Sequence, residues 1–122
     1  MTEMNHTGLI EASIERVWNE RDDQRRLTAI GEIYALDATM YEPARSVTGH
    51  QAMSQLVAGV LADMPPGFRF EVTGPALGHH DMFVARWEGR VPDGQVIVSG
   101  SDAARVKDAR IQEHWFFFDP KA

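Results

Sequence analysis

The chain has 122 residues, a length typical of one domain, and its hydrophobic content of 43% is too high for a disordered protein. Its formal charge is −6, and no run of Lys or Arg is long enough to follow a phosphate backbone. We therefore expect no nucleic-acid partner. The sequence has no cysteine, no apolar signal core and no apolar stretch of roughly 18–20 residues; we therefore expect one cytoplasmic domain over residues 1–122, without disulfides, cysteine-bound metals or membrane association.

Three helices are predicted in the first half of the chain. Apolar residues recur at helical spacing over residues 9–19, 27–34 and 50–64. The polar residues 20–24 predict a loop between the first two helices. Pro65, Pro66 and Gly67 end the third.

Strands are predicted in the second half. Residues 37–42 form a turn and a short strand that Pro43 ends, and residues 68–77, 82–91, 95–106 and 110–118 form a four-stranded antiparallel meander. Helices followed by strands indicate an α+β fold. We expect the sheet to curve into a cone, with the helices on its concave side and a ligand pocket between them.

One strand places a charge on an apolar face. In residues 95–106 this face consists of Val96, Val98, Gly100, Asp102, Ala104 and Val106. If the face points inward, Asp102 lies in the core or the pocket, where burial of a lone carboxylate is costly or raises its pKa. A structural hydrogen bond and proton chemistry would both account for such a residue.

Two further residues are candidates for chemistry. Glu42 ends a short strand directly before Pro43, which predicts a position at the rim of the cavity. His114 shares one face of the last strand with Phe116 and Phe118, the face we assign to the cavity. The expected substrate-binding residues are Trp87, Phe116, Phe118, Ile14, Trp18 and Arg86.

No metal or cofactor is expected. His79, His80 and Asp81 could begin a metal site, but adjacent strand residues point to opposite faces and no further ligands follow at a familiar spacing. A hairpin turn is the simpler interpretation. The sequence also has no Gly-rich phosphate loop after a strand and no Ser/His/Asp signature.

The other face of the last strand predicts a partner subunit. It carries Ile111, Glu113, Trp115 and Phe117. An apolar patch of this kind would be exposed in a monomer, so we expect a homodimer formed through the sheet.

Several segments together resemble a known family. They are Trp18-Asn19-Glu20-Arg21-Asp22, Tyr34-Ala35-Leu36-Asp37-Ala38-Thr39, Tyr41-Glu42-Pro43, Thr48-Gly49-His50-Gln51-Ala52, Arg86-Trp87-Glu88, Gly100-Ser101-Asp102 and Ala109-Arg110-Ile111. In order and spacing they resemble a SnoaL-like protein of the nuclear transport factor 2-like superfamily, over nearly the whole chain. The resemblance implies a cone-shaped α+β barrel of three N-terminal helices on a curved, mainly antiparallel sheet.

The resemblance also implies roles for single residues. Steroid isomerases of this superfamily have a general-base aspartate just before the proline, where this chain has Glu42, and a protonated aspartate that Asp102 matches. Their helix-one tyrosine is matched by Ile14, so that donor is missing here. SnoaL-type cyclases use an inward aspartate, again Asp102, as acid/base. Limonene-type epoxide hydrolases need an Asp-Arg-Asp set, of which Arg86 and Asp102 could supply two members.

These observations predict a cofactor-independent acid/base enzyme of the isomerase, cyclase or hydrolase class, acting on an apolar molecule that bears a carbonyl or hydroxyl. Apolar neighbours would keep Asp102 neutral as a buried acid, while Glu42 or His114 would move the proton. Two alternatives stay open: a non-catalytic small-ligand-binding domain, and a dimerisation module whose cavity is filled by side chains.

Overall fold

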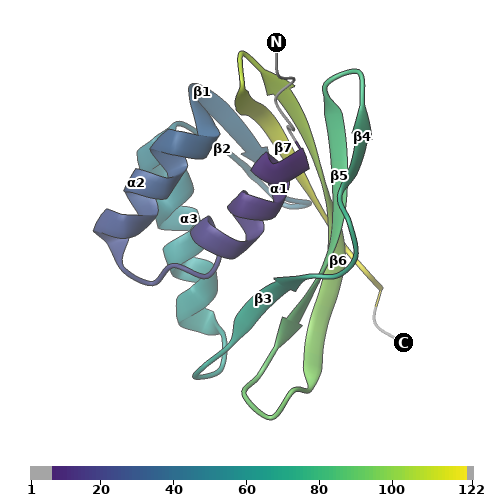
Figure 1. Cartoon of the computed structure of the whole chain (residues 1–122). Helices are drawn as coiled ribbons and strands as arrows, with labels where there is room; N and C mark the ends of the chain where they lie inside the picture. Colours follow the sequence, from purple (N-terminus) through teal and green to yellow (C-terminus); the bar gives the residue numbers. More distant parts are fainter. Residues whose placement is uncertain (1–6, 121–122) are drawn as a thin grey trace.

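The computed structural model describes residues 7–120 (Figure 1). The helical segments are α1 (Thr7–Ala12), the π-helical segment η1 (Ser13–Val17), α2 (Asp23–Ile33) and α3 (His50–Asp63). The strands are β1 (Tyr34–Tyr41), β2 (Ser46–Thr48), β3 (Arg69–Val72), β4 (Leu77–His79), β5 (Met82–Arg90), β6 (Val96–Lys107) and β7 (Arg110–Phe118).

All described strands belong to one mixed sheet. Its order is β2-β1-β7-β6-β5-β3, and β4 pairs with β5 beside that path. The pairs are antiparallel except for β1 and β7, which run parallel. The predicted meander of the second half is therefore present, but the sheet is larger than predicted, because β1 and β2 extend it past β7 and the strand predicted over residues 68–77 is divided into β3 and β4.

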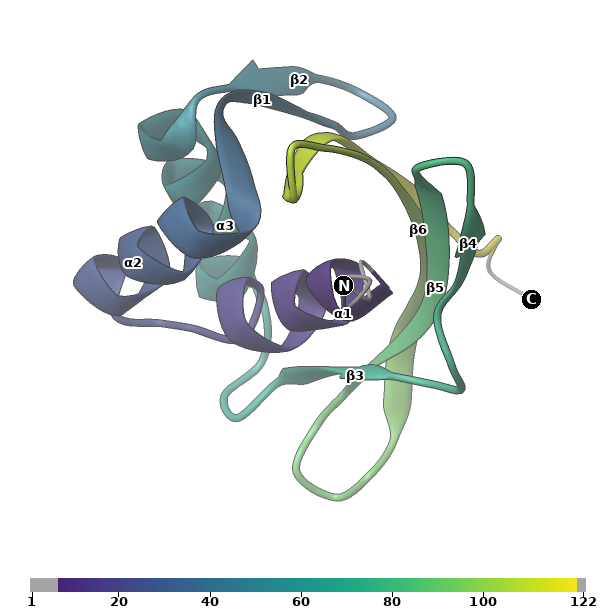
Figure 2. The same ribbon diagram turned by 45° about the horizontal axis from the view of Figure 1, so that its top comes forward.

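The sheet is strongly curved, and the helices cover its concave side (Figure 2). Helix α1 lies inside the curve and contacts β5, β6 and β7. Helices α2 and α3 pack against each other and against β1. The α+β expectation is confirmed, but not all three helices are N-terminal: α3 follows β2 in the chain, so it is inserted into the order of strands.

The first helix changes character half-way. The α-helical hydrogen bonding stops at Ala12, and the backbone N–H of Trp18 donates to the carbonyl of Ser13 at 3.2 Å, five residues back. Single π-helical turns inside helices often occur at functional sites. Here the turn places Ser13, Ile14 and Val17 in the interior.

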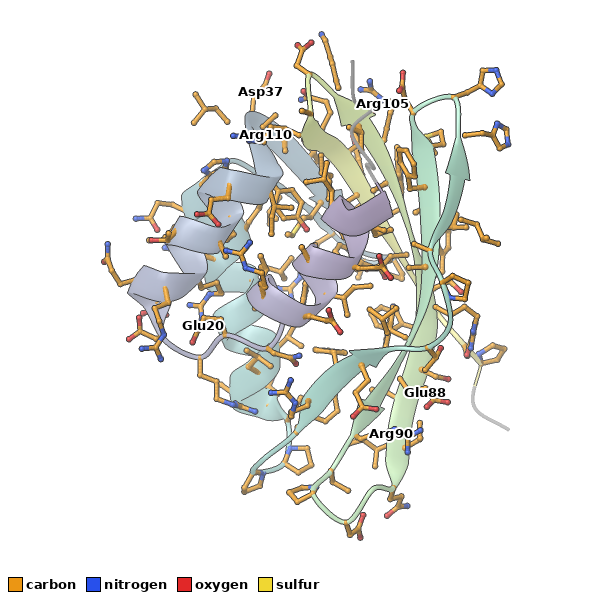
Figure 3. All side chains as sticks on the ribbon, viewed as in Figure 1. Glu20, Asp37, Glu88, Arg90, Arg105 and Arg110 are labelled. Carbon is orange, nitrogen blue, oxygen red and sulfur yellow. The ribbon has the colours of Figure 1, made fainter. Side chains whose placement is uncertain are left out.

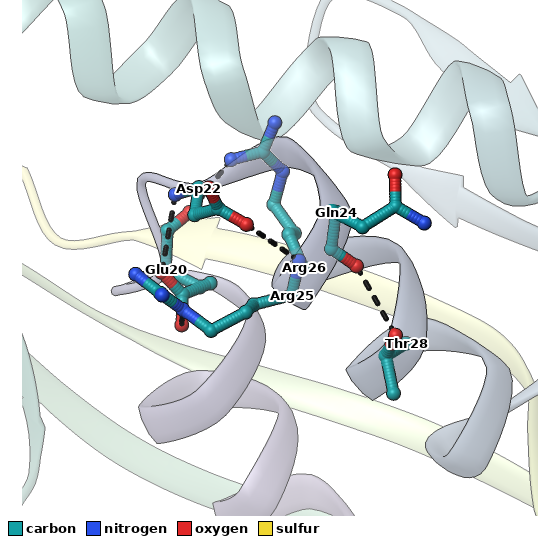
Figure 4. Close-up of polar contacts among 6 residues, drawn as sticks. All are labelled: Glu20, Asp22, Gln24, Arg25, Arg26 and Thr28. Atoms are coloured by element: carbon teal, nitrogen blue, oxygen red, sulfur yellow. Dashed lines mark hydrogen bonds and ion pairs between the residues drawn. The ribbon is translucent and has the colours of Figure 1, made fainter.

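Helix α2 begins earlier than its apolar spacing predicted, because Asp22 caps it. The Asp22 carboxylate accepts the backbone N–H of Arg25 at 2.8 Å (Figure 4). Arg26, in the first turn, is buried and donates to the Ser54 hydroxyl of α3 at 2.9 Å and to the Glu20 carbonyl at 2.6 Å. This buried guanidinium ties the start of α2 to α3, away from the sheet.

The alternation predicted for β6 is confirmed from Gly100 to Val106, but not at Val96, which was assigned to the inward face and is exposed. Gly100, Asp102, Ala104 and Val106 are buried on the concave side, whereas the residues between them are half-buried. The corresponding prediction for β7 is wrong at Ile111, which is fully buried. A register shift between Arg105 and Val106 interrupts the alternation there, so Ile111 faces the core and not the outer surface.

Gly100 permits a close contact in the middle of this sheet. A Cβ at this position would lie 2.2 Å from the Phe117 carbonyl oxygen and 2.6 Å from the Trp87 indole. We expect Gly100→Ala to lower the free energy of unfolding by about 1–3 kcal/mol, measured by urea denaturation. The control is Gly31→Ala in α2, where a Cβ meets nothing within 4 Å and stability should rise by up to about 1 kcal/mol. Equal effects at the two positions would contradict this account of β6.

Candidate functional site

A cavity of about 180 Å³ lies between the helices and the concave face of the sheet. It is lined by Ile14, Trp18, Glu42, Val60, Met64, Phe70, Trp87, Val98, Asp102, Phe116 and Phe118. Of these residues only Glu42 and Asp102 carry a charge. The cavity is therefore an apolar space with two carboxylates. The charged side chains labelled in Figure 3 are not part of its lining and lie at the periphery of the molecule.

Aromatic rings form much of the cavity wall and hold one another edge to face. Trp18 contacts Phe70 and Phe116, with ring centroids 5.9 and 5.1 Å apart. Trp87 contacts Phe70 at 5.3 Å and Phe118 at 5.9 Å. Because edge-to-face pairs fix ring orientation, these five rings form a preformed wall suited to a flat, apolar ligand.

Asp102 is 2% exposed, and each of its two carboxyl oxygens has a hydrogen-bond partner. The Trp87 indole Nε1–H donates to Oδ1 at 2.7 Å. Nε2 of His114 lies 2.7 Å from Oδ2. Each oxygen keeps a second lone pair, so the carboxylate can still accept a proton or a hydrogen bond from a ligand.

His114 lies behind Asp102 and does not line the cavity. Its ring is fully buried and stacks on Phe116 and on Tyr34, at centroid distances of 4.2 and 5.9 Å. Its second nitrogen, Nδ1, is 2.8 Å from the Tyr34 hydroxyl. That hydroxyl is also hydrogen-bonded to Oγ of Ser13 in η1. A buried polar chain therefore runs from Asp102 on β6 through β7 and β1 to the π-helical turn.

Burial dominates the electrostatics of Tyr34. It raises the pKa of the phenol well above its usual value, and the charge of Asp102 adds to the effect. The hydrogen bond to Ser13 acts in the opposite direction, and the Trp18 indole lowers this pKa as well. Nε1 of Trp18 itself is buried and has no hydrogen-bond partner of normal geometry among the described residues. Tyr34 therefore stays an uncharged hydroxyl over the physiological pH range.

Glu42 lies at the rim of the cavity, directly after β1. Its side chain is 14% exposed, and Nε of Arg45 donates to its carboxylate at 2.6 Å. Backbone hydrogen bonds between the same two residues close the turn that leads into β2. The structure thus holds Glu42 by a local ion pair and does not bring it into contact with Asp102 or His114 through any hydrogen bond that the described residues make.

Arg86 lies on the outer face of the sheet, away from the cavity. It is half-exposed and binds Asp119 at 2.6 Å and Ser101 at 3.0 Å. With the hydroxyl of Ser99, Arg86 lowers the pKa of the Asp119 carboxyl to about 2. These contacts fix the segment after β7, and with it Phe118 at the cavity rim.

The structure brings most of the predicted site residues to one place. Those that line the cavity are Asp102, Glu42, Trp87, Phe116, Phe118, Ile14 and Trp18. His114 supports Asp102 from behind, and Arg86 lies elsewhere. The sequence analysis did not identify Ser13 and Tyr34. Ser13 could have been found, because it lies on the apolar stripe of the first helix, where a buried hydroxyl needs a hydrogen-bond partner.

In the cluster His79-His80-Asp81, His79 ends β4, and His80 and Asp81 form the turn to β5; all three residues are exposed. His80 and Asp81 both have positive φ, 51° and 67°, as a tight hairpin turn requires. Nδ1 atoms of His79 and His80 lie 2.7 Å apart. Within residues 7–120 no three His, Asp or Glu side chains come close enough together to hold a metal ion.

The sequence and the fold match known proteins. The SnoaL-like domain family matches residues 10–114. The chain belongs to the SnoaL-like family. No curated protein of established function matches its sequence. Within the described part of the chain, no helix has the length and apolar character needed to span a lipid bilayer.

Solved structures of other proteins share the architecture. A protein from Agrobacterium tumefaciens, provisionally assigned as an isomerase of this family, is 25% identical with a TM-score of 0.86, over 94% of this chain and 97% of its own. A provisionally assigned SnoaL-like polyketide cyclase from Jannaschia is 14% identical with a TM-score of 0.72, over 98% and 91%. TerC, crystallised with polyporic acid, is 17% identical with a TM-score of 0.71, over 93% and 91%.

Proposed function

We propose that this SnoaL-like protein binds a neutral, largely apolar molecule with a carbonyl or hydroxyl group and moves a proton on it through Asp102, without a metal or organic cofactor. The observation that carries the proposal is the position of Asp102: a buried carboxylate, held by Trp87 and His114, at the wall of an otherwise apolar cavity. Burial of a carboxylate is costly even when it is hydrogen-bonded, and ionisable groups kept in such clefts often belong to functional sites.

The proton step follows from this geometry. Asp102 would accept a proton from a carbon next to the ligand carbonyl: the C–H bond breaks, its electron pair stays on the ligand as an enolate, and the proton goes to a carboxylate oxygen. Transfer of the proton from Asp102 to a different atom of the enolate gives an isomerase outcome. Attack of the enolate carbon on a second carbonyl of the ligand, with the proton passing from Asp102 to the new alkoxide oxygen, gives a cyclase outcome. A positioned general base of this kind typically contributes about 10²–10⁴-fold.

The comparisons support the ligand class. Structural relatives include an isomerase and a polyketide cyclase by provisional assignment, and TerC, which shares the fold, was crystallised with polyporic acid. The wall of aromatic rings supports a flat ligand skeleton, because ring faces and edges offer contacts without requiring polar groups.

One observation favours a second function, ligand binding without catalysis. Asp102 is almost fully buried, and each of its oxygens already has a hydrogen-bond partner within the protein. In this alternative Asp102 is a structural acceptor that orients Trp87, and the ligand is held by apolar contact alone. The two functions share the cavity and differ only in whether bound molecules react.

Binding is tested with 2-tetralone, a flat apolar ketone, and with tetralin, its hydrocarbon analogue. Titrations would follow quenching of tryptophan fluorescence, since Trp18 and Trp87 line the cavity. The proposal predicts saturable binding of the ketone that Val60→Trp, which fills the cavity, abolishes. If neither probe binds, the cavity is no ligand site and the proposed function fails.

We further propose that the outer face of the sheet joins two copies into a homodimer. Val84, Trp115 and Phe117 lie on this face, and Phe117 is 56% exposed. Sedimentation velocity at micromolar concentration should give a dimer that Phe117→Asp converts to a monomer. Leu36→Asp is the control, since Leu36 is 84% exposed but lies in the irregular part of β1. A monomeric wild-type protein would contradict the proposal.

A further inference from the structure

Asp102 and three buried side chains behind it form a chain of hydrogen bonds, and in each bond the position of the hydrogen decides which group donates. Its members are Ser13, Tyr34, His114 and Asp102, each hydrogen-bonded to the next. We propose that Ser13 and Tyr34 act as positioning residues that fix His114 as the neutral tautomer with its proton on Nε2, and so hold Asp102 as a carboxylate in the resting protein. The consequence for catalysis, that Asp102 begins as a base, rests on the proposed function.

One arrangement satisfies every donor in the chain. The Ser13 hydroxyl donates to the Tyr34 oxygen, the Tyr34 hydroxyl donates to Nδ1 of His114, and Nε2–H donates to Oδ2 of Asp102. The Trp87 indole, which can only donate, occupies Oδ1. All hydrogens then point toward Asp102, and they favour its charged form, since the charge of a carboxylate is stabilised by the donors around it.

The reverse arrangement leaves a buried hydrogen without an acceptor. If Asp102 were protonated and donated to His114, Nδ1–H would donate to Tyr34, and Tyr34 would donate to Ser13. The hydrogen of Ser13 would then need a further acceptor, but Ser13 Oγ has no other partner within residues 7–120 and is fully buried. An unsatisfied buried donor costs about 1–3 kcal/mol.

A doubly protonated His114 would also leave the Ser13 hydrogen without an acceptor. Nδ1–H would again donate to the Tyr34 oxygen, which turns the Tyr34 and Ser13 hydrogens in the unfavourable direction. Tyr34 cannot relieve this by losing its proton, because burial raises its pKa. The groups facing the His114 ring nitrogens are thus Asp102 from β6 and Tyr34 from β1, and both favour the neutral Nε2–H tautomer.

The direction of the chain also limits where a proton can go. A proton that Asp102 accepts from a ligand cannot pass along the chain, since the chain ends at a buried serine. It must leave Asp102 on the cavity side. This assignment differs from the sequence-based expectation of a resting neutral Asp102, and it makes return of the proton to the ligand the direct outcome.

The test is the ¹⁵N spectrum of the imidazole nitrogens in the full-length wild-type protein at neutral pH, where a protonated ring nitrogen and an unprotonated one have widely separated shifts. The His114 signals are assigned by their loss in His114→Gln. We expect Nε2 to carry a proton and Nδ1 to be an unprotonated, hydrogen-bonded nitrogen. A proton on Nδ1, or on both nitrogens, would overturn the proposal.

A pair of tyrosine variants separates this role from a general effect on folding. In Tyr34→Phe, Nδ1 loses its donor, so its signal should move toward the shift of a free ring nitrogen while Nε2 keeps its proton. Tyr41→Phe is the control: Tyr41 lies at the other end of β1 and its hydroxyl donates to Glu113, so the His114 signals should not move. Equal shifts in both variants, or none in Tyr34→Phe, would also overturn it. The readout needs neither ligand nor turnover, so the proposed function can fail while this assignment stands.

Discussion

Asp102→Asn should reduce, by about 10²–10⁴-fold, the rate at which the protein exchanges the α-hydrogens of bound 2-tetralone for deuterium in D₂O. The exchange assay detects those proton abstractions after which Asp102 exchanges the accepted proton for deuterium from the cavity side, whatever the natural substrate is. Asparagine keeps the size of the side chain and can still accept from Trp87, but it cannot take a proton from carbon. The expected loss is therefore a loss of chemistry with the cavity left in place.

Two controls show whether Asp102→Asn loses proton transfer or ligand binding, and whether the second carboxylate contributes. Tryptophan quenching shows whether Asp102→Asn still binds the ketone, and we expect its affinity to change far less than its exchange rate. Glu42→Gln tests the second carboxylate at the cavity, which Arg45 holds in an ion pair at the rim; a small effect there is expected. If wild-type protein binds 2-tetralone but exchanges it no faster than Asp102→Asn does, the non-catalytic binding function is the correct one.

His114→Phe should lower the free energy of unfolding by about 1.5–3 kcal/mol, because it removes one of the two hydrogen bonds of a buried carboxylate. Phenylalanine retains the flat ring that stacks between Tyr34 and Phe116, so the loss of packing is kept small. Urea or thermal denaturation measures the change. The Tyr34 hydroxyl also loses its acceptor in this variant, which adds to the cost.

A double-mutant cycle assigns the loss to the Asp102–His114 pair. In the His114→Phe background, Asp102→Asn removes the unpaired charge and should restore part of the stability, whereas in the wild-type background the same change should destabilise the protein. Such a change of sign can arise only if the two residues interact. Additive effects of the two substitutions would contradict the account of the buried chain.

Strand alternation located the central residue of the site. One charge on the apolar face of β6 predicted an inward Asp102, and the equivalent reasoning on β7 placed His114 and Phe116 inward, since both strands have a period of two over that stretch. The same reasoning failed at Ile111, where a register shift changes which side chain points inward. A shift of this kind depends on the partner strand and leaves no mark in the strand's own sequence.

The rest of the site depends on long-range contacts. Tyr34 reaches His114 only because β1 runs parallel to β7, a pairing between strands far apart in the sequence. Ser13 reaches Tyr34 because a π-helical turn rotates the first helix. Apolar spacing predicted that helix but could not distinguish a π turn from a continuous α-helix. Whether the cone contains an open cavity is decided by side-chain packing across it, which the order of elements does not determine.

The account depends most on the claim that the cavity beside Asp102 is where a small molecule binds. A crystal structure of the protein grown with 2-tetralone tests this directly. We predict density for the ketone among the rings of Trp18, Phe70, Trp87, Phe116 and Phe118, with its carbonyl-bearing edge toward Asp102. An empty cavity, a cavity closed by rearranged side chains, or a ketone bound only elsewhere would contradict the account.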